Sequence, residues 1–466
     1  MIQLYPAPAS VLPGQRLVLH VSTDQPRFRV HFFRWSVALQ PVLRSDWLRG
    51  EHAPPRGPDQ DWHWPAYGFE IPGDWRSAVY IACCETDGAP PPAPWMPQAA
   101  ALFVVRGATR GSLLVKLPLA TWHAYNHSGG GCFYDNPPRS THPPGARLSL
   151  RRPGGGIGGA IFGAPDHYDT SSPRQSFAHW DARFIRWLLR NGYEPAFCTD
   201  FDIHADPDLC GRYSLLLSAG HDEYWSEPAR DHVEAFIANG GNAAFFGANL
   251  CWWRIHYVDQ GLAMVCHQGG PQGALDHWWP RGGVGRPEDA LGGASYRHGG
   301  GWWDGPRRVP GYTVHAADHW VFAGTGLRRG EVFGAATRPP LIGYECDGVP
   351  LEREAETGAR AGAGIGASDA LPRVALAASS YGTPATYELL ASSVLGDDWQ
   401  ELPAREQHAA GQGIHAACMG LFERGGTVFS AGTTDWAQVL DSGQDTPVER
   451  ITANVIDRLL SSGGAR

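Results

Sequence analysis

The sequence lacks the features that mark membrane proteins and nucleic-acid-binding proteins. No apolar run approaches the roughly 20 residues that a membrane-spanning helix needs. The first six residues contain neither a basic region nor the apolar core of a signal peptide, so a cytoplasmic location is expected. Acidic residues outnumber basic ones by 47 to 38, and the net charge of -9 argues against nucleic acid and anionic membrane surfaces as partners.

The chain is also poor in the cysteine patterns that form disulfides or zinc sites. Its nine cysteines are an odd number and include no Cys-x-x-Cys pair. Cys83 and Cys84 are adjacent, and neighbouring residues of a strand point to opposite faces. Free, buried thiols in a reducing compartment are therefore expected, and a cysteine zinc site is not.

The overall amino-acid composition is that of a globular protein with many loops. Apolar residues make up 43% of the 466 residues and charged residues 18%, which excludes wholesale disorder. The length predicts two or three domains. The 59 glycines, 38 prolines and 19 tryptophans indicate loops that are held by large aromatic anchors.

Residues 1–108 are predicted to form an all-β domain. Four segments alternate apolar and polar residues or are rich in β-branched and aromatic residues, at 15–22, 28–34, 78–82 and 100–105, and turns rich in proline and glycine separate them. This spacing is typical of an immunoglobulin-like sandwich. An irregular β extension of the main domain is the alternative.

Residues 109–466 are predicted to form an α/β domain. Strands are expected at 113–118, at 195–199, from Leu215 to the polar cluster at 221–224, within 240–249 and at 426–432, and helices at 177–188, from Ser226 to Gly240, and at 448–460. The alternation of strands and helices implies parallel βαβ units. Residues 256–375 are less regular and read as an insertion, with β segments at 320–322 and 341–345 and a surface loop at 359–367.

Two motifs in this domain look like ligand sites, but their spacing argues against that reading. The glycine-rich segment 153–163 lacks the Lys-Ser/Thr ending of a phosphate-binding loop, so a mobile or tightly packed loop is expected. The acidic run from Asp200 to Asp208 lacks the central glycine and terminal glutamate of a calcium-binding EF-hand. A solvated loop with a helix cap is expected there.

The chemistry-bearing residues follow two predicted strands. The strand that begins at Leu215 ends in a cluster of His221, Asp222, Glu223 and Tyr224, and Asn249 ends the next strand. Ligands of open α/β sheets bind at the carboxyl ends of strands. Neither a Cys nor a Ser stands at the elbow position that nucleophilic enzymes of this architecture use. The remaining side chains suit a hard metal ion with oxygen ligands, or else a hydrogen-bonded network that closes the strand end.

Several segments resemble the C-terminal region of the N,N-dimethylformamidase large (beta) subunit family. They are Gly-His-Asp-Glu-Tyr-Trp-Ser at 220–226, Gly-Gly-Asn at 240–242, Phe-Phe-Gly-Ala-Asn at 245–249, Thr-Trp-His-Ala-Tyr-Asn at 121–126 and Ala-Gly-Thr-Thr-Asp-Trp at 431–436. The resemblance implies an immunoglobulin-like domain beside a class I glutamine-amidotransferase-like, flavodoxin-like parallel-sheet domain. It also implies a mononuclear iron, Fe(III), that is bound by two tyrosines and one glutamate and takes part in amide hydrolysis.

The resemblance assigns the implied roles residue by residue. Glu223 and Tyr125 match the glutamate and one tyrosine ligand; Tyr134 is the choice for the second tyrosine, with Tyr168 in reserve. His221 then fits a base that orients water. Asn249 is a donor to the substrate oxygen or else caps a turn. Glu345 handles the leaving amine or else is an ordinary strand residue.

The resemblance also sets the expected partners. A small or N-alkylated amide is the expected substrate, and both a homo-oligomer and a separate small subunit are compatible with the sequence. Two other functions remain open. An inactive amidotransferase-like module could bind a carbohydrate or protein through the tryptophan pairs at 252–253, 278–279 and 302–303. A cysteine hydrolase would use Cys132, Cys251 or Cys346.

Overall fold

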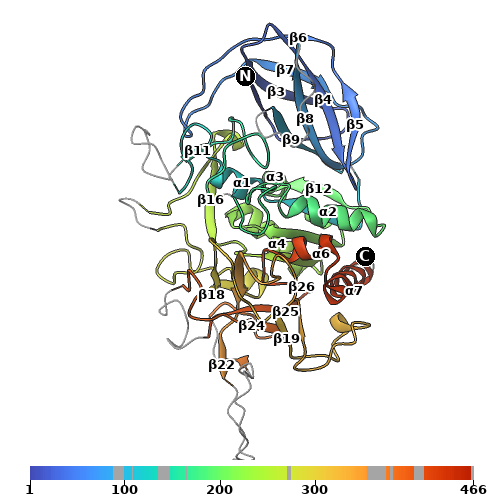
Figure 1. Ribbon diagram of the computed structural model, residues 1–466, viewed down its shortest axis with the longest axis vertical. Coiled ribbons are helices and arrows are strands. Elements are labelled where there is room, and N and C mark those ends of the chain that lie inside the picture. The colour runs from blue at the N-terminus through green and yellow to red at the C-terminus, as the bar shows by residue number, and fades with distance from the viewer. Residues whose placement is uncertain are drawn as a thin grey trace, which may run out of the picture.

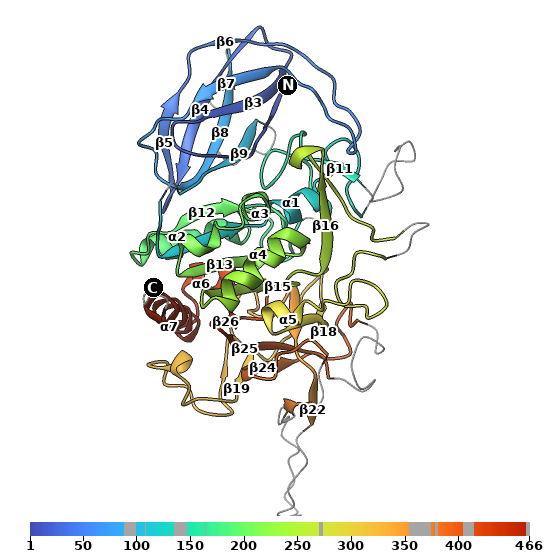
Figure 2. The ribbon, with the colours of Figure 1, turned by 180° about the vertical axis from the view of Figure 1, so that it is seen from behind.

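The computed structural model describes residues 1–87, 99–107, 109–134, 147–163, 165–269, 274–353, 374–377, 381–403 and 414–462. The segment 359–367, predicted as a surface loop, lies outside these ranges. Figure 1 and Figure 2 show a β module at the N-terminal end of the elongated molecule and a larger α/β body below it. Within the described residues no helix is both long and apolar enough to cross a membrane.

The N-terminal module consists of two facing sheets with a core between them. One sheet has the strand order β1-β3-β7 and the other β2-β9-β8-β4-β5, with β6 paired to β4. The strands are β1 (Ile2–Pro6), β2 (Ser10–Val11), β3 (Arg16–Thr23), β4 (Arg27–Trp35), β5 (Leu39–Arg44), β6 (Leu48–Arg49), β7 (Ala66–Glu70), β8 (Ala78–Thr86) and β9 (Ala100–Val105). Leu17 and Leu19 from one sheet and Val30 and Phe32 from the other belong to one buried cluster. All four strands expected from the sequence are present; the immunoglobulin-like assignment stays a prediction.

A nine-stranded mixed sheet forms the centre of the larger body. Its order is β12-β10-β13-β15-β26-β25-β24-β19-β20. These strands are β10 (Leu113–Leu117), β12 (Ala196–Thr199), β13 (Leu215–His221), β15 (Asn242–Ala248), β19 (Tyr312–Val314), β20 (Val332–Phe333), β24 (Glu388–Val394), β25 (Ala416–Arg424) and β26 (Gly426–Ser430). The first five strands of the order run parallel and the others pair antiparallel. The parallel core expected from the sequence is therefore present.

Helices cover both faces of this sheet. They are α1 (Leu119–Tyr125), α2 (Asp181–Arg190), α3 (Asp200–Ala205), α4 (Glu227–Ala238), α5 (Asp289–Gly292), α6 (Trp436–Ser442) and α7 (Thr446–Ser462). Leu215 and Leu217 pack in the cluster that contains α2, α6 and α7, whereas Leu216 between them packs in the cluster with α3 and α4. This alternation is what a strand buried on both faces requires.

Three small sheets complete the body. One has the order β11-β17-β16-β14, with β11 (Arg147–Ser149), β14 (Tyr224–Ser226), β16 (Trp253–Val258) and β17 (Ala263–Val265). The others pair β18 (Ser295–Gly301) with β21 (Glu345–Gly348), and β22 (Leu351–Arg353) with β23 (Val374–Leu376). The β18–β21 pair brings Glu345, which lies inside the predicted insertion, to the carboxyl ends of the parallel strands.

Four local predictions were wrong. Helix α2 begins only at Asp181. The acidic run was expected as a solvated loop with a helix cap; the cap is present as a reciprocal capping box between Thr199 and Asp202, but the run begins with the helix α3 and not with a solvated loop. Residues Trp320–Phe322 form a 3-10 helix, whose first turn is capped by the side chain of His319. The strand expected at 341–345 starts at its last residue, since β21 spans Glu345–Gly348. Residues 256–375, which were expected to form an insertion, are also less separate from the main sheet than expected, because their strand β19 is part of that sheet.

Candidate active site

The predicted site residues other than Glu345 follow the carboxyl ends of three neighbouring parallel strands. The chain leaves β10 into α1, whose last residue is Tyr125. Strand β13 ends at His221, and Glu223 follows before β14. Strand β15 ends just before Asn249. Because β10, β13 and β15 are hydrogen-bonded neighbours, these side chains gather at one edge of the sheet.

Two tyrosine hydroxyls converge on the Glu223 carboxylate. Tyr125 donates to Oε2 at 2.9 Å, and Tyr134 donates to Oε1 at 2.9 Å. The two hydroxyl oxygens lie 2.9 Å apart. Tyr224 donates to the Tyr134 hydroxyl at 2.7 Å and accepts from Gln268. The structure thus brings together all three residues that were predicted as metal ligands.

Burial dominates the electrostatics of this group. Burial and the nearby Glu223 carboxylate hold the pKa of Tyr125 and Tyr134 well above the ordinary tyrosine value. Burial also raises the pKa of Glu223 to about 7, although the neighbouring His221 opposes this effect. The Tyr134 ring is 41% exposed, so only its hydroxyl end reaches the buried carboxylate. Ionised phenols at this position would require a nearby positive charge.

The remaining predicted residues form a second, connected group. His221 Nε2 lies 2.8 Å from Glu345 Oε2 and 3.4 Å from Glu223 Oε2. Asn249 Nδ2 donates to Glu345 Oε2 at 3.0 Å and lies 3.2 Å from His221 Nε2. Burial alone would lower the pKa of His221, but the Glu345 carboxylate outweighs it and raises the pKa. His221, Asn249 and Glu345 are therefore brought together, as predicted.

Gln175 orients the imidazole of His221, a contact that was not predicted from the sequence. Its carboxamide oxygen lies 2.9 Å from His221 Nδ1. An acceptor at this distance holds the proton on Nδ1, so Nε2 is the atom that gains and loses a proton. Gln175 has a positive φ of 59°, and it precedes His221 by 46 residues in a segment without regular secondary structure. Neither a motif nor a periodic pattern marks it.

Backbone geometry at the strand ends sets the positions of these side chains. Gly220 has a φ of 72°, and a Cβ there would lie 2.5 Å from the side chain of Trp180. Asn249 has a φ of 50°, a left-handed conformation that asparagine tolerates better than most residues. The backbone N–H groups of Asn249 and Leu250 donate to the buried Asp347 carboxylate at 2.8 and 3.2 Å. Strained backbone that is held in this way is frequent at functional sites.

A buried ion network lies below the site. Lys116 is the only lysine in the sequence. Its ammonium lies 2.6 Å from both Asp200 and Asp222 and 4.3 Å from the centre of the Trp225 ring. Burial opposes the charge of Lys116, but the two carboxylates raise its pKa above the ordinary value. Asp200 also accepts from the backbone of Ala120 at the start of α1, so the network ties α1 to the residue that precedes Glu223.

The site opens into a cavity of about 570 Å³. Its inner end carries the predicted residues Tyr125, Tyr134, Glu223, Asn249 and Glu345, and its walls are rich in aromatic rings. The lining residues beyond the predicted set are Phe162, Gly163, Arg174, Trp252, Trp253, His277, Tyr296, Trp303, Asp304, Tyr344 and Glu401. A cavity of this size is in the range of binding sites for small organic ligands.

The tryptophan pairs do not form an exposed platform. Trp252 and Trp253 are each 8% exposed, and Trp278 is fully buried. Trp252, Trp253 and Trp303 instead line the cavity next to Glu223. Exposed tryptophan pairs beside a blocked strand end would favour a carbohydrate-binding or protein-binding module. This combination is not observed.

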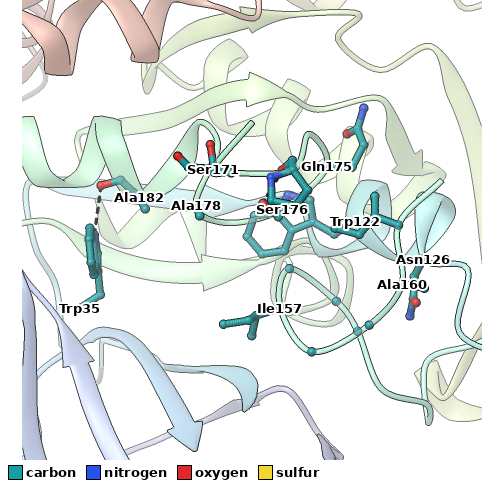
Figure 3. Close-up of a pocket in the computed structure, with 18 of the residues that line it drawn as sticks. Trp35, Trp122, Asn126, Ile157, Ala160, Ser171, Gln175, Ser176, Ala178 and Ala182 are labelled. Atoms are coloured by element: carbon teal, nitrogen blue, oxygen red, sulfur yellow. Dashed lines mark hydrogen bonds between the residues drawn. The ribbon is translucent and has the colours of Figure 1, made fainter. Parts of the chain in front are cut away.

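A second cavity, of about 380 Å³, lies behind Gln175 and is shown in Figure 3. The glycine-rich segment 154–159 forms one side of it, and Trp122, Ile157 and Ala178 supply apolar surface. Trp35 of the N-terminal module reaches this cavity and donates from its ring nitrogen to the Ala182 carbonyl at 3.1 Å (Figure 3). Of the two forms predicted for the glycine loop, mobile or tightly packed, the packed one agrees with this arrangement, because a Cβ on Gly156 would lie 2.6 Å from Trp122.

The reserve tyrosine and the cysteines are not among the residues that line the cavity. The Tyr168 hydroxyl accepts from the backbone N–H of Arg307 at 2.7 Å, and it does not line the cavity. All nine cysteines are free and buried, as predicted. Burial raises the pKa of Cys251 to about 12 and that of Cys346 well above its usual value, which disfavours reactive thiolates.

The donor set around Glu223 fits a hard metal ion. Two phenol oxygens and a carboxylate are ligands that Fe(III) accepts more readily than zinc does. Asn249 Oδ1 is buried without a hydrogen-bond partner within the described residues, so a bound ligand could satisfy it. A cation would also supply the positive charge that ionised Tyr125 and Tyr134 need.

A separate group of His256, His267 and Asp276 has ligand atoms within 4.8 Å of one another. Arg254 Nε, however, lies 3.0 Å from Asp276 Oδ1. This guanidinium already neutralises the carboxylate that a metal would use, and both histidines are partly exposed. We interpret the group as an anchor of the segment that carries Gln268 and His277.

Comparisons with known proteins agree with the motifs. Residues 40–449 match the family described as N,N-dimethylformamidase beta subunit-like, C-terminal. The N,N-dimethylformamidase beta subunits of Paracoccus aminophilus and of an Alcaligenes species are each 32% identical to this chain over 74 residues. The aligned stretch covers 16% of this chain and 10% of each relative, so it spans about a tenth of the length of these proteins.

Proposed function

Because the chain belongs to the N,N-dimethylformamidase beta subunit-like family, we propose that it is a metal-dependent amidohydrolase. The substrate would be a small or N-alkylated amide, and the bond cleaved its C–N bond. The observation that carries this proposal is the convergence of Tyr125 and Tyr134 on the two oxygens of Glu223. This oxygen cluster forms the inner end of an aromatic cavity that a small organic substrate could enter.

Tyr125, Tyr134 and Glu223 would hold the metal, for which we propose a single ferric ion. Such an ion polarises a carbonyl group and makes hydroxide available near neutral pH. The rest of the chemistry would fall to side chains of the chain itself. The neighbouring His221, Asn249 and Glu345 are all buried, which strengthens their electrostatic interactions with a substrate.

In this proposal His221 is the group that moves protons. Gln175 fixes the proton on Nδ1, so Nε2 can take a proton from water and return it to the leaving amine. Glu345, 2.8 Å from Nε2, would stabilise the imidazolium that forms in between. Asn249 Nδ2 would donate to the substrate oxygen as negative charge develops there. Burial of all three groups would keep bulk water from competing for these contacts.

The experiment that tests the proposal is an amide hydrolysis assay on the full chain. Amine release would be measured for a panel of formamides and N-alkylated acetamides after loading with iron. We expect turnover of at least one amide, and a fall of at least about 100-fold for Glu223→Gln. Glu352→Gln, an exposed glutamate on β22, is the matched control and should keep full activity. Equal turnover by both variants would contradict the proposal.

A partner subunit is also part of the proposal, because the two relatives are named as beta subunits. Light scattering of the purified chain, alone and with a co-purified protein, would distinguish a homo-oligomer from a complex with a second subunit.

A further inference from the structure

The outer half of the active-site cavity carries negative charge that the described residues do not neutralise. Asp304 and Glu401 line the cavity, and both are exposed at its rim. Within the described part of the chain neither makes an ion pair; Glu401 accepts a hydrogen bond from the neutral Tyr296 hydroxyl at 2.8 Å. The side chain of Gln400, the residue before Glu401, holds the backbone of Asp304: it accepts from the Asp304 N–H at 2.9 Å and donates to the Asp304 carbonyl at 2.8 Å.

The possible counter-charges among the lining residues are engaged elsewhere or absent. Arg174 binds Asp166 at 2.7 Å. Burial lowers the pKa of His277 to about 4, so its ring is neutral at pH 7. The inner carboxylate Glu345 is paired with His221. Among the described residues, Asp304 and Glu401 are therefore the lining carboxylates without an ion-pair partner, and burial raises the pKa of Glu401.

Aromatic rings line the same cavity as the rim carboxylates and the oxygen cluster. Trp252 packs on Tyr296 with ring centres 5.4 Å apart, and Trp253 stacks on His277 at 3.9 Å. Trp303 lies on the same wall, with its ring nitrogen 3.4 Å from Glu345 Oε1. Aromatic faces beside carboxylates attract organic cations, and quaternary ammonium groups are recognised in this way. The cavity volume of about 570 Å³ also leaves room for more than a small amide alone.

We propose that this site accepts amides that carry a positively charged ammonium group a few bonds from the amide carbonyl. The amide would lie against Tyr125, Glu223 and Asn249, and the cation among Trp252, Trp303 and the rim carboxylates. This inference rests on the proposed amidohydrolase function, but it concerns the rim of the cavity rather than the proposed metal ligands.

The first test measures binding without catalysis. Choline and 3,3-dimethylbutan-1-ol have the same shape and differ in charge, so calorimetry with both isolates the contribution of the cation. We expect the full chain to bind choline at least about tenfold more tightly. Asp304→Asn and Glu401→Gln should each reduce this preference by about threefold or more, and the double variant further. The control Glu352→Gln removes one exposed negative charge elsewhere and should leave the preference unchanged.

The second test uses hydrolysis, so that the two proposals can fail separately. The N,N-dimethylamides of trimethylammonioacetic acid and of 3,3-dimethylbutanoic acid again differ in charge at constant shape. In the rim variants Asp304→Asn and Glu401→Gln, the kcat/KM of the charged amide divided by that of the neutral amide should fall below the wild-type ratio. The difference in intrinsic reactivity between the two amides is the same for every variant, so it cancels in this comparison. Hydrolysis of both with an unchanged ratio would overturn the cation inference and support the amidohydrolase. A choline preference lost in the rim variants, with no hydrolysis, would support the cation site and contradict the amidohydrolase. Equal binding of choline and its neutral analogue by wild type would overturn the inference outright.

Discussion

The hydroxyl oxygens of Tyr125 and Tyr134 lie 2.9 Å apart, and each donates to a different oxygen of Glu223. The two tyrosines are nine residues apart, one at the end of α1 and the other in the loop that follows. Two phenol hydroxyls and one carboxyl group at such distances concentrate negative potential at one point whenever they lose protons. This relationship is the structural basis of the proposed metal centre.

Replacement of either tyrosine tests the ligand assignment. Tyr125→Phe and Tyr134→Phe each remove one oxygen from the cluster and should lower kcat/KM for amide hydrolysis by at least about 100-fold. Tyr168→Phe is the matched control, because its hydroxyl contacts only the backbone of Arg307 among the described residues. It should stay within about twofold of wild type. Loss of activity in Tyr168→Phe, with Tyr134→Phe unaffected, would reverse the assignment.

Gln175 is expected to act as a positioning residue through His221. Gln175→Met removes the acceptor 2.9 Å from Nδ1 and frees the imidazole to change tautomer. The expected result is a fall in kcat of about tenfold or more with little change in KM. Gln40→Met, on the exposed strand β5, is the control. A rise in KM at unchanged kcat would show that Gln175 serves substrate binding instead.

Lys116 should be important for stability. Lys116→Met leaves the Asp200 and Asp222 carboxylates buried without their cation, and breaking a buried pair in this way costs about 3–5 kcal/mol. Chemical unfolding followed by tryptophan fluorescence would measure this loss. Because Lys116 is the only lysine, an amine-reactive label should modify only the N-terminus of the native chain. A change below about 1 kcal/mol would refute the role assigned to the network.

The Asp276 anchor predicts a pH dependence of stability. Burial raises the pKa of Asp276, but hydrogen bonds from His256 and His267 outweigh it, so folding lowers this pKa. The carboxylate therefore contributes stability above its unfolded pKa of about 3.9, and this contribution is lost as the pH falls further. The difference in unfolding free energy between wild type and Asp276→Asn should be constant from pH 7 to about pH 5 and shrink below about pH 4.

The exposed Asp318→Asn is the control for this pH series, since Asp318 forms no ion pair within the described residues. A difference between wild type and Asp276→Asn that grows on acidification would contradict the assigned direction of the shift.

The sequence predicted the parallel core well because its strands carry strong local signals. The strand that ends at His221 is an unbroken apolar run, and the following helix has a capping serine at Ser226. Helix α3 was missed because the acidic run suggested a solvated loop. The spacing of Thr199 and Asp202 was nevertheless that of a capping box.

The site was predictable in part. Glu223 and Tyr125 lie in recognisable motifs, whereas the choice of Tyr134 over Tyr168 depended on the resemblance alone. The contacts of Gln175 with His221 and of Glu401 with Tyr296 depend on packing between segments far apart in the chain. No local pattern encodes such contacts. They become visible only when the sheet brings the strand ends together.

The most direct test of the account is the metal content of the purified full chain after loading with iron and removal of unbound metal. The account predicts close to one iron per chain, retained by Glu352→Gln and lost in Glu223→Ala. A visible absorption band from phenolate coordinated to Fe(III) should disappear in Tyr125→Phe or Tyr134→Phe. Less than about 0.2 equivalents of any transition metal in wild type, unchanged by Glu223→Ala, would contradict the central claim.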